Sequence, residues 1–118
     1  MSSRLRGRKV WVVGASSGIG AELARELVRR GADVAISGRR PAELAEVSCG
    51  SMTTVPVDVT DPGAVDEAVA AVREGLGGLD TVVFSAGYWK QFDAAEWDRE
   101  TFARHVEVNL LGLNNVLA

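Results

Sequence analysis

A cluster of glycines near the start of the chain constrains the fold more than any other feature. The apolar run Val10–Val13 leads directly into residues 14–20, which read GASSGIG, and an amphipathic pattern follows. A strand, a glycine turn and a helix in this order place free N–H groups and the positive end of the helix dipole at the turn, where they favour a phosphate. Gly14 permits the sharp turn, Gly18 lets the backbone approach a pyrophosphate, and Gly20 lets the helix pack close to the sheet. The alternative is a glycine-rich turn that binds nothing.

Short apolar runs recur along the chain and are mostly continuous instead of alternating, as expected for parallel strands covered on both faces. They predict strands at Lys9–Val13, Asp33–Ser37 and Leu79–Ser85. A weaker run, Met52–Val59, contains Pro56 and is expected near an edge of the sheet.

Helical patterns lie between these runs. Ile19, Leu23 and Leu27 recur at four-residue spacing and predict the apolar face of a helix that Gly31 ends. The alternation of strands and helices predicts a parallel sheet with right-handed crossovers. Further helices are expected from Pro41, from Asp61 to Gly75, and from about Trp97 onward.

Length and composition agree with one soluble domain. The 118 residues are 47% hydrophobic and 25% charged, with a net charge of −3, so no basic field attracts nucleic acid. No apolar run approaches the roughly 20 residues that span a membrane. Residues 1–118 are expected to form a single partial domain with residues 1–8 as an N-terminal arm. Cys49 is alone, and the first residues lack an apolar leader, so a cytoplasmic location is expected.

The spacing of the glycines, G-x-x-x-G-x-G, differs from the general dinucleotide fingerprint. Three further segments lie in register with it, namely residues 57–61 (VDVTD), 85–87 (SAG) and 108–112 (VNLLG). From about Leu5 to Ala118 the chain resembles the short-chain dehydrogenase/reductase family. The resemblance implies an α/β fold, an NAD(P)-binding Rossmann-like doubly wound parallel sheet with strand order 3-2-1-4, truncated after its fifth helix. Val13 stands where the family often has threonine, and Phe84 and Ser85 replace its paired asparagines.

The end of the second predicted strand distinguishes between two dinucleotides. NAD-binding domains usually have an acid there, whereas residues 37–40 read SGRR. A guanidinium pairs bidentately with a 2′-phosphate, so NADP is expected in preference to NAD, with Arg39 before Arg40 as its reader. Two solvated arginines are the alternative. The resemblance implies that Asp58 lies by the adenine amino group and Val59 beside the ring, while a turn or capping acid is the alternative for Asp58. The expected cofactor-binding residues are Gly14, Ser16, Ser17, Gly18, Ile19, Gly20, Arg39, Arg40, Asp58, Val59, Ser85, Ala86 and Gly87.

The family resemblance also implies a catalytic serine and a Tyr-x-x-x-Lys pair after the fifth helix. The chain has one tyrosine, Tyr88, and Phe92 stands four residues later. Asn109 alone matches the family's catalytic residues, and without the family it is simply a polar residue in an apolar helix. No metal site is predicted, because His105 has no partner at metal-ligand spacing.

The function implied is that of an NADP-dependent oxidoreductase that interconverts a small-molecule alcohol and a ketone by hydride transfer. The family also implies a homo-oligomer, a dimer or a tetramer, and nothing in the chain indicates a nucleic-acid or membrane partner. If the chain is complete as given, the alternative is a non-catalytic NADP-binding module such as a sensor or a partner subunit.

Overall fold

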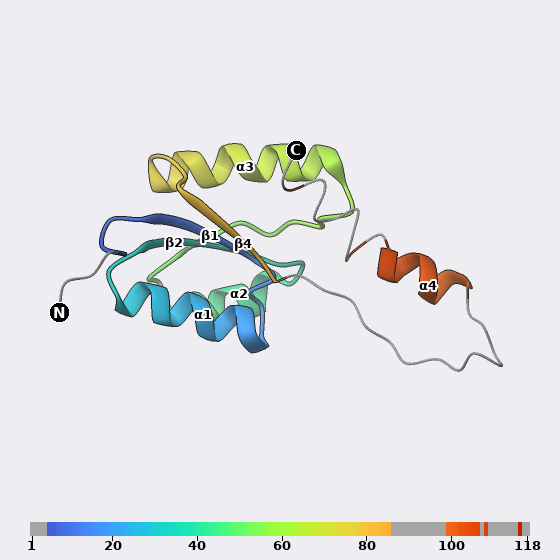
Figure 1. The fold of residues 1–118 in the computed structure, drawn as a ribbon, viewed down its shortest axis with the longest axis horizontal. Helices are drawn as coiled ribbons and strands as arrows, with labels where there is room; N and C mark the ends of the chain where they lie inside the picture. Colours follow the sequence, from blue (N-terminus) through green and yellow to red (C-terminus); the bar gives the residue numbers. More distant parts are fainter. Residues whose placement is uncertain (1–4, 86–98, 107, 109–115, 117–118) are drawn as a thin grey trace.

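Four parallel strands form the centre of the molecule in the computed structural model, which describes residues 5–85, 99–106, 108 and 116 (Figure 1). They lie side by side in the order β3-β2-β1-β4, which confirms the predicted order. Every neighbouring pair runs parallel. The strands are β1 (Lys9–Val13), β2 (Asp33–Ser37), β3 (Thr53–Thr54) and β4 (Thr81–Phe84).

Helices cover both faces of this sheet. Figure 1 shows α1 and α2 on one face and α3 on the other, so the sheet is doubly wound as predicted. The fourth helix, α4, follows the sheet in the chain. The helices span Gly18–Arg29 (α1), Pro41–Ser48 (α2), Pro62–Leu76 (α3) and Arg99–Val106 (α4).

The core consists of two apolar layers that share the central strands. Val10 and Val12 of β1 pack toward α1 and α2, whereas Trp11 and Val13 pack toward α3. All four are at most 3% exposed, because alternate side chains of a strand point to opposite faces and both faces are covered. The indole Nε1 of Trp11 donates a 2.8 Å hydrogen bond to the hydroxyl of Ser37, so this buried polar group has a partner.

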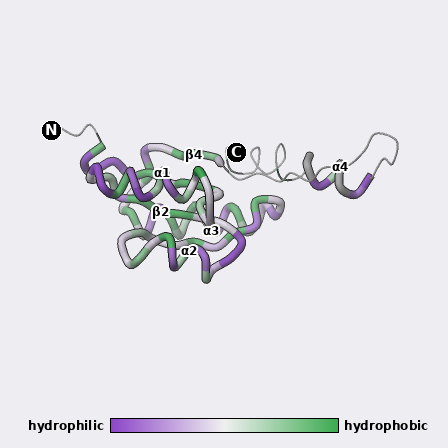
Figure 2. The backbone as a smooth tube through the Cα atoms, turned by 90° about the horizontal axis from the view of Figure 1, so that it is seen from below, coloured by the Kyte–Doolittle hydropathy of each residue, from purple (hydrophilic) through white to green (hydrophobic). Residues whose placement is uncertain are grey.

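The inward face of α1 differs from the prediction. Ile19 was expected on the apolar face, but it is 84% exposed. Small residues together with Leu27 face the sheet instead, and they let the helix backbone approach the strands closely. Along α1 the tube in Figure 2 alternates between hydrophobic and hydrophilic colours, as expected for a helix on a surface. The buried residues of α1 are Gly20, Ala21, Ala24 and Leu27.

Two strands, β3 and β4, are shorter in the structure than the sequence predicts. The weak run Met52–Val59 forms the strand only at Thr53–Thr54, at the edge of the sheet. Pro56 has no N–H group, yet the N–H groups of Val55 and Val57 on either side still donate to β2 and its extension, each over 2.9 Å. At the other edge, β4 spans Thr81–Phe84, shorter than the predicted run 79–85.

The structure describes only part of the predicted N-terminal arm and of the predicted final helix. Leu5 packs against the α1 side of the core, and the N–H of Gly7 donates to the carbonyl of Gly31 over 3.0 Å. The predicted final helix is observed as Arg99–Val106. Beyond it the structure describes Val108 and Val116, which are both buried in the core layer that contains Trp11. No helix in the described ranges is long and apolar enough to cross a membrane.

Candidate functional site

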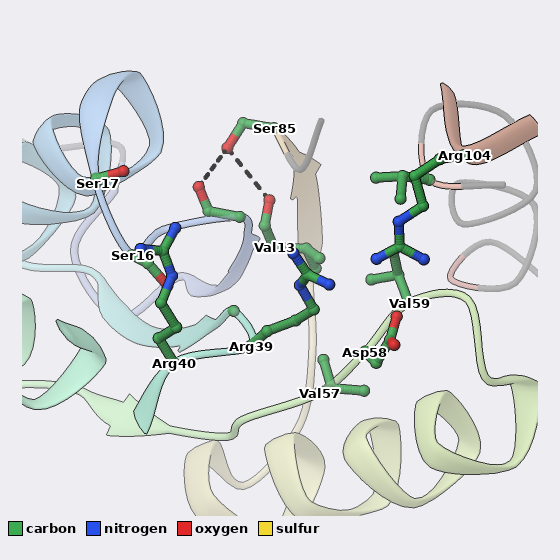
Figure 3. Close-up of a pocket in the computed structure, with 13 residues that line it drawn as sticks. Val13, Ser16, Ser17, Arg39, Arg40, Val57, Asp58, Val59, Ser85 and Arg104 are labelled. Atoms are coloured by element: carbon green, nitrogen blue, oxygen red, sulfur yellow. Dashed lines mark hydrogen bonds between the residues drawn. The ribbon is translucent and has the colours of Figure 1, made fainter. Parts of the chain in front are cut away.

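A pocket opens at the carboxyl ends of the central strands, where the connections after β1, β2 and β4 meet (Figure 3). Ligands of doubly wound sheets bind at this edge. Much of the predicted binding set lines the pocket, and its members come from four separate segments of the chain. These residues are Gly14, Ser16, Ser17, Arg39, Arg40, Asp58, Val59 and Ser85.

The glycine loop is held against the end of β2. The N–H groups of Gly14 and Ala15 both donate to the carbonyl of Ser37, over 2.8 and 3.0 Å. Gly14 and Gly18 have φ angles of 93° and 63°, which lie in the region that favours glycine. A Cβ added at Gly18 would find no atom within 4 Å, so the space in front of this backbone is open.

Gly20 serves a different purpose from the other two glycines. It is buried, and a Cβ added there would collide with the carbonyl oxygen of Gly14 and lie 2.6 Å from the hydroxyl of Ser85. The loop, the start of α1 and the end of β4 therefore meet at Gly20 without room for a side chain. Gly20, like Gly18 and Ile19, does not itself line the pocket.

The start of α1 leaves its backbone donors without a side-chain cap. Ser17 occupies the N-cap position, but its hydroxyl makes no capping hydrogen bond. The first N–H groups of a helix have no partner within the helix, and the dipole adds positive charge at the same place. No acidic residue stands in the first turn of α1, so nothing there opposes an anion.

Ser85 joins the end of β4 to the end of β1. Its hydroxyl lies 3.2 Å from the carbonyl oxygens of both Val13 and Gly14 and donates to this pair (Figure 3). The serine that replaces an asparagine of the family pattern thus still makes a hydrogen bond to the glycine loop.

The two arginines after β2 differ in their surroundings, although both line the pocket (Figure 3). Arg40 precedes α2, and its Nη1 donates to Oε1 of Glu43 over 2.9 Å. Arg39 makes no ion pair with any residue in the described part of the chain. Neither side chain is buried.

Asp58 lines the pocket and also makes the hydrogen bonds of a turn. Its Oδ1 accepts from the backbone N–H of Thr60 over 3.0 Å and from the Thr60 hydroxyl over 2.7 Å, which is the bonding of a turn. These hydrogen bonds, followed by the nearby charges of Arg104 and Arg39, hold the pKa of Asp58 below its usual range. A carboxylate acceptor therefore lines the pocket at neutral pH.

The structure adds residues to the pocket that the sequence analysis missed. Arg104 comes from α4 and points toward Asp58 and Val59 (Figure 3). It lies four residues before Val108, within the helix that the sequence predicts from about Trp97 onward, and this helical spacing was the available signal. The additional lining residues are Val13, Gly38, Val57, Arg104 and Val108. Ala86, Gly87 and Asn109 lie outside the described residues.

A doubly wound parallel sheet with a glycine loop and a pocket at the carboxyl ends of its strands defines a Rossmann-like nucleotide-binding fold. The family model described as short chain dehydrogenase matches residues 8–118. The chain belongs to the short-chain dehydrogenase family.

Individual relatives agree with this assignment. The chain is 34% identical over 113 residues to human dehydrogenase/reductase SDR family member 7, covering 87% of this chain and 33% of that protein. It is similar, with a TM-score of 0.89 and 29% identity, to 3-ketoacyl-(acyl-carrier-protein) reductase from Brucella melitensis complexed with NADH, covering 96% of this chain and 48% of the other. It is also similar to an actinorhodin polyketide ketoreductase with NADPH, with a TM-score of 0.87 and 31% identity over 93% of this chain and 45% of the other. The chain thus spans between a third and about half of the length of these proteins.

Proposed function

We propose that the pocket binds NADP and that this chain is the cofactor-binding part of an oxidoreductase that interconverts an alcohol and a ketone. The observation that carries the proposal is the pair Arg39 and Arg40 at the end of β2, on the rim of a pocket that the glycine loop also lines. An acid at this position would bond a ribose 2′-hydroxyl and repel a 2′-phosphate, whereas guanidinium groups attract the phosphate.

In this proposal the glycine loop receives the pyrophosphate. The open space before Gly18 and the uncapped N–H groups after Ser17 provide the room and the donors. Gly14, Ser16 and Ile19 border the same path, and Gly20 keeps the helix close beneath it. Ser85, Ala86 and Gly87 follow β4 and would flank the nicotinamide end.

The adenosine end lies on the other side of the loop. Asp58 would accept a hydrogen bond from the adenine amino group, because its carboxylate stays ionised and its Oδ2 is not used by Thr60. Val59, which is buried beside it, would contact the ring. The solved relatives include complexes with NADH and with NADPH, so the family accepts both dinucleotides and the arginines favour NADP here.

The chemistry would follow from the bound cofactor, which exchanges a hydride with the carbonyl carbon. Of the catalytic residues that the family implies, this chain offers Asn109 as the match, and its 118 residues contain no Tyr-x-x-x-Lys. A small-molecule alcohol or carbonyl substrate, a homo-oligomeric state and a cytoplasmic location complete the proposal.

Isothermal titration of the full chain with NADP and NAD tests the cofactor assignment. We expect NADP to bind at least about tenfold more tightly, and Arg39→Ala to remove most of this preference, because a charge-assisted hydrogen bond contributes about 1.5–3 kcal/mol. Arg73→Ala on α3 is the control, since that arginine is exposed and does not line the pocket. Equal affinities for both dinucleotides in the unchanged chain would contradict the NADP assignment.

A further inference from the structure

Arg40 lies at the rim of the pocket but is bonded to its own helix. It is the N-cap residue of α2, and Glu43 follows three residues later in the first turn. The guanidinium Nη1 and the carboxylate Oε1 are 2.9 Å apart, which is a charge-assisted hydrogen bond. Arg39, the residue before it, has no such partner in the described ranges.

The second carboxylate oxygen of Glu43, Oε2, is buried, unlike the exposed Arg40 side chain with which Glu43 pairs. Its Oε2 is enclosed and has no hydrogen-bond partner among the residues that the structure describes. A buried acceptor without a donor is unfavourable, and more so when it carries charge. Arg40 is therefore the group that compensates the Glu43 carboxylate. If Arg40 turned toward a ligand, it would leave that carboxylate without a counter-ion.

We propose that Glu43 is a specificity-determining residue of the pocket, which holds Arg40 in an ion pair and so leaves Arg39 as the main reader of a 2′-phosphate. The inference rests on the proposed function, because it assigns the adenosine end of NADP to this side of the pocket. Glu43 weakens the binding of a 2′-phosphorylated nucleotide in two ways. It competes with the phosphate for Arg40, and its own negative charge repels the phosphate.

The expected size of the effect follows from the exposure of the pair. The Arg40 side chain is 69% exposed and that of Glu43 is 38% exposed, so solvent screens their attraction. Ion pairs of this kind contribute little, and releasing Arg40 would tighten binding by about two- to fivefold. A nucleotide without the 2′-phosphate would not respond.

The experiment measures the affinity of the full chain for 2′,5′-ADP and for 5′-AMP by isothermal titration. Glu43→Gln keeps the size of the side chain and removes its charge. Glu46→Gln is the matched control, because it removes the same charge from an exposed position one turn later in α2. We expect Glu43→Gln to bind 2′,5′-ADP about two- to fivefold more tightly and 5′-AMP unchanged, and Glu46→Gln to change neither affinity.

The same titrations with Arg40→Gln separate competition from simple repulsion. In that background Glu43→Gln should lose most of its effect, because there is no guanidinium to release. Independently of any change at Glu43, Arg40→Gln should weaken 2′,5′-ADP binding less than Arg39→Gln does.

Three results would overturn the inference. One is a gain for Glu43→Gln that Glu46→Gln matches, another is a gain that persists in full without Arg40, and the third is a larger loss at Arg40 than at Arg39. Each of these leaves the proposed function standing if the unchanged chain still prefers 2′,5′-ADP. If the unchanged chain binds neither nucleotide, the proposed function and the inference both fail.

Discussion

The starts of α1 and α3 offer an instructive comparison. Both helices follow a residue with good capping ability, Ser17 for α1 and Asp61 for α3. Asp61 accepts hydrogen bonds from the N–H groups of Gly63 and Ala64, over 3.1 and 3.3 Å. Ser17 makes no capping bond, although serine is as strong a capping residue as aspartate.

Position relative to the pocket accounts for this difference. Ser17 lines the pocket, whereas Asp61 does not. A capped α1 would have its donors occupied, and an uncapped α1 keeps them for a ligand. The start of α2 is uncapped for a different reason, since Arg40 lines the pocket and its guanidinium has no acceptor for the first N–H groups of the helix. Local rules of helix formation are thus satisfied away from the pocket and relaxed at its rim.

The largest expected effect comes from placing one methyl group at each helix start. Gly20→Ala in α1 forces a Cβ against the carbonyl of Gly14, so we expect a loss of about 1–3 kcal/mol in the free energy of unfolding. NADP affinity should fall at least about tenfold, because the Cβ would displace the glycine loop. A tenfold loss corresponds to about 1.4 kcal/mol of binding free energy. Gly63→Ala in α3 is the control, where the nearest atom is 3.5 Å away and the stability should rise by up to about 1 kcal/mol. Urea unfolding and titration calorimetry measure both. Equal destabilisation by the two variants would contradict the comparison.

Removal of the two N-cap side chains tests the comparison directly. Asp61→Ala should lower the free energy of unfolding by about 1 kcal/mol, because two N–H groups lose their acceptor. Ser17→Ala should lower it by less than about 0.5 kcal/mol, since no capping bond is lost. The midpoints of urea unfolding at constant m-value give both quantities. A cost for Ser17→Ala as large as that for Asp61→Ala would show that Ser17 caps α1 in solution.

The carboxyl ends of α2 and α3 extend the comparison with a smaller effect. Both end in a left-handed residue, Gly77 after α3 and Cys49 after α2, where φ is 45°. Because a side chain disfavours this conformation, Cys49→Gly should stabilise the protein by about 0.5–1 kcal/mol. Gly77→Ala is the reciprocal change and should destabilise it by about 1 kcal/mol. Thermal melts of the reduced protein provide the measurement, and a loss of stability in Cys49→Gly would refute the argument.

The smallest expected effect concerns Asp58. This residue lies in the connection between β3 and α3, shortly before the N-cap Asp61, and it lines the pocket. Its lowered pKa means that its bonds to Thr60 stabilise the fold above the ordinary aspartate pKa. This contribution disappears as the pH falls through the lowered value. Thr60→Val removes the 2.7 Å hydroxyl bond and keeps the backbone bond, so the pKa of Asp58 should rise only part of the way to its ordinary value. Carboxyl-carbon NMR titration follows this pKa, and an unchanged value in Thr60→Val would be inconsistent with the hydroxyl bond.

The sequence predicts the elements whose signals are local. The glycine loop, the Asp61 cap and the runs of β1 and β2 all depend on neighbouring residues, and the structure places each as expected, whereas the runs of β3 and β4 are shorter than predicted. Ile19 was misassigned because its size dominated the four-residue pattern. The helix face is set by Gly20 and the small residues that follow, which allow a close approach to the sheet.

The pocket was predictable where a residue lies shortly after the carboxyl end of a strand, as Arg39 does after β2 and Asp58 after β3. Arg104 was not found, because it lies far along the chain from the other pocket residues and no local pattern marks it as a neighbour of Asp58. The pairing of Arg40 with Glu43 was within reach of the sequence, since opposite charges three residues apart meet on a helix. The effect of this pair on the pocket could not be predicted, because it depends on the burial of Glu43 Oε2, which no sequence pattern indicates.

The Ser85 bonds also bear on the order in which the protein folds. This hydroxyl reaches Gly14 across 71 residues of chain, whereas β1 and β2 are near neighbours in sequence. Distant pairings form more slowly, because a longer loop must close before they are gained. The contacts of the glycine loop with β1 and β2 can therefore form early. The loop gains its remaining contacts, those with Ser85, only when β4 docks. In a refolding experiment, competence to bind nucleotide would appear with the arrival of β4 and later than most of the helix signal.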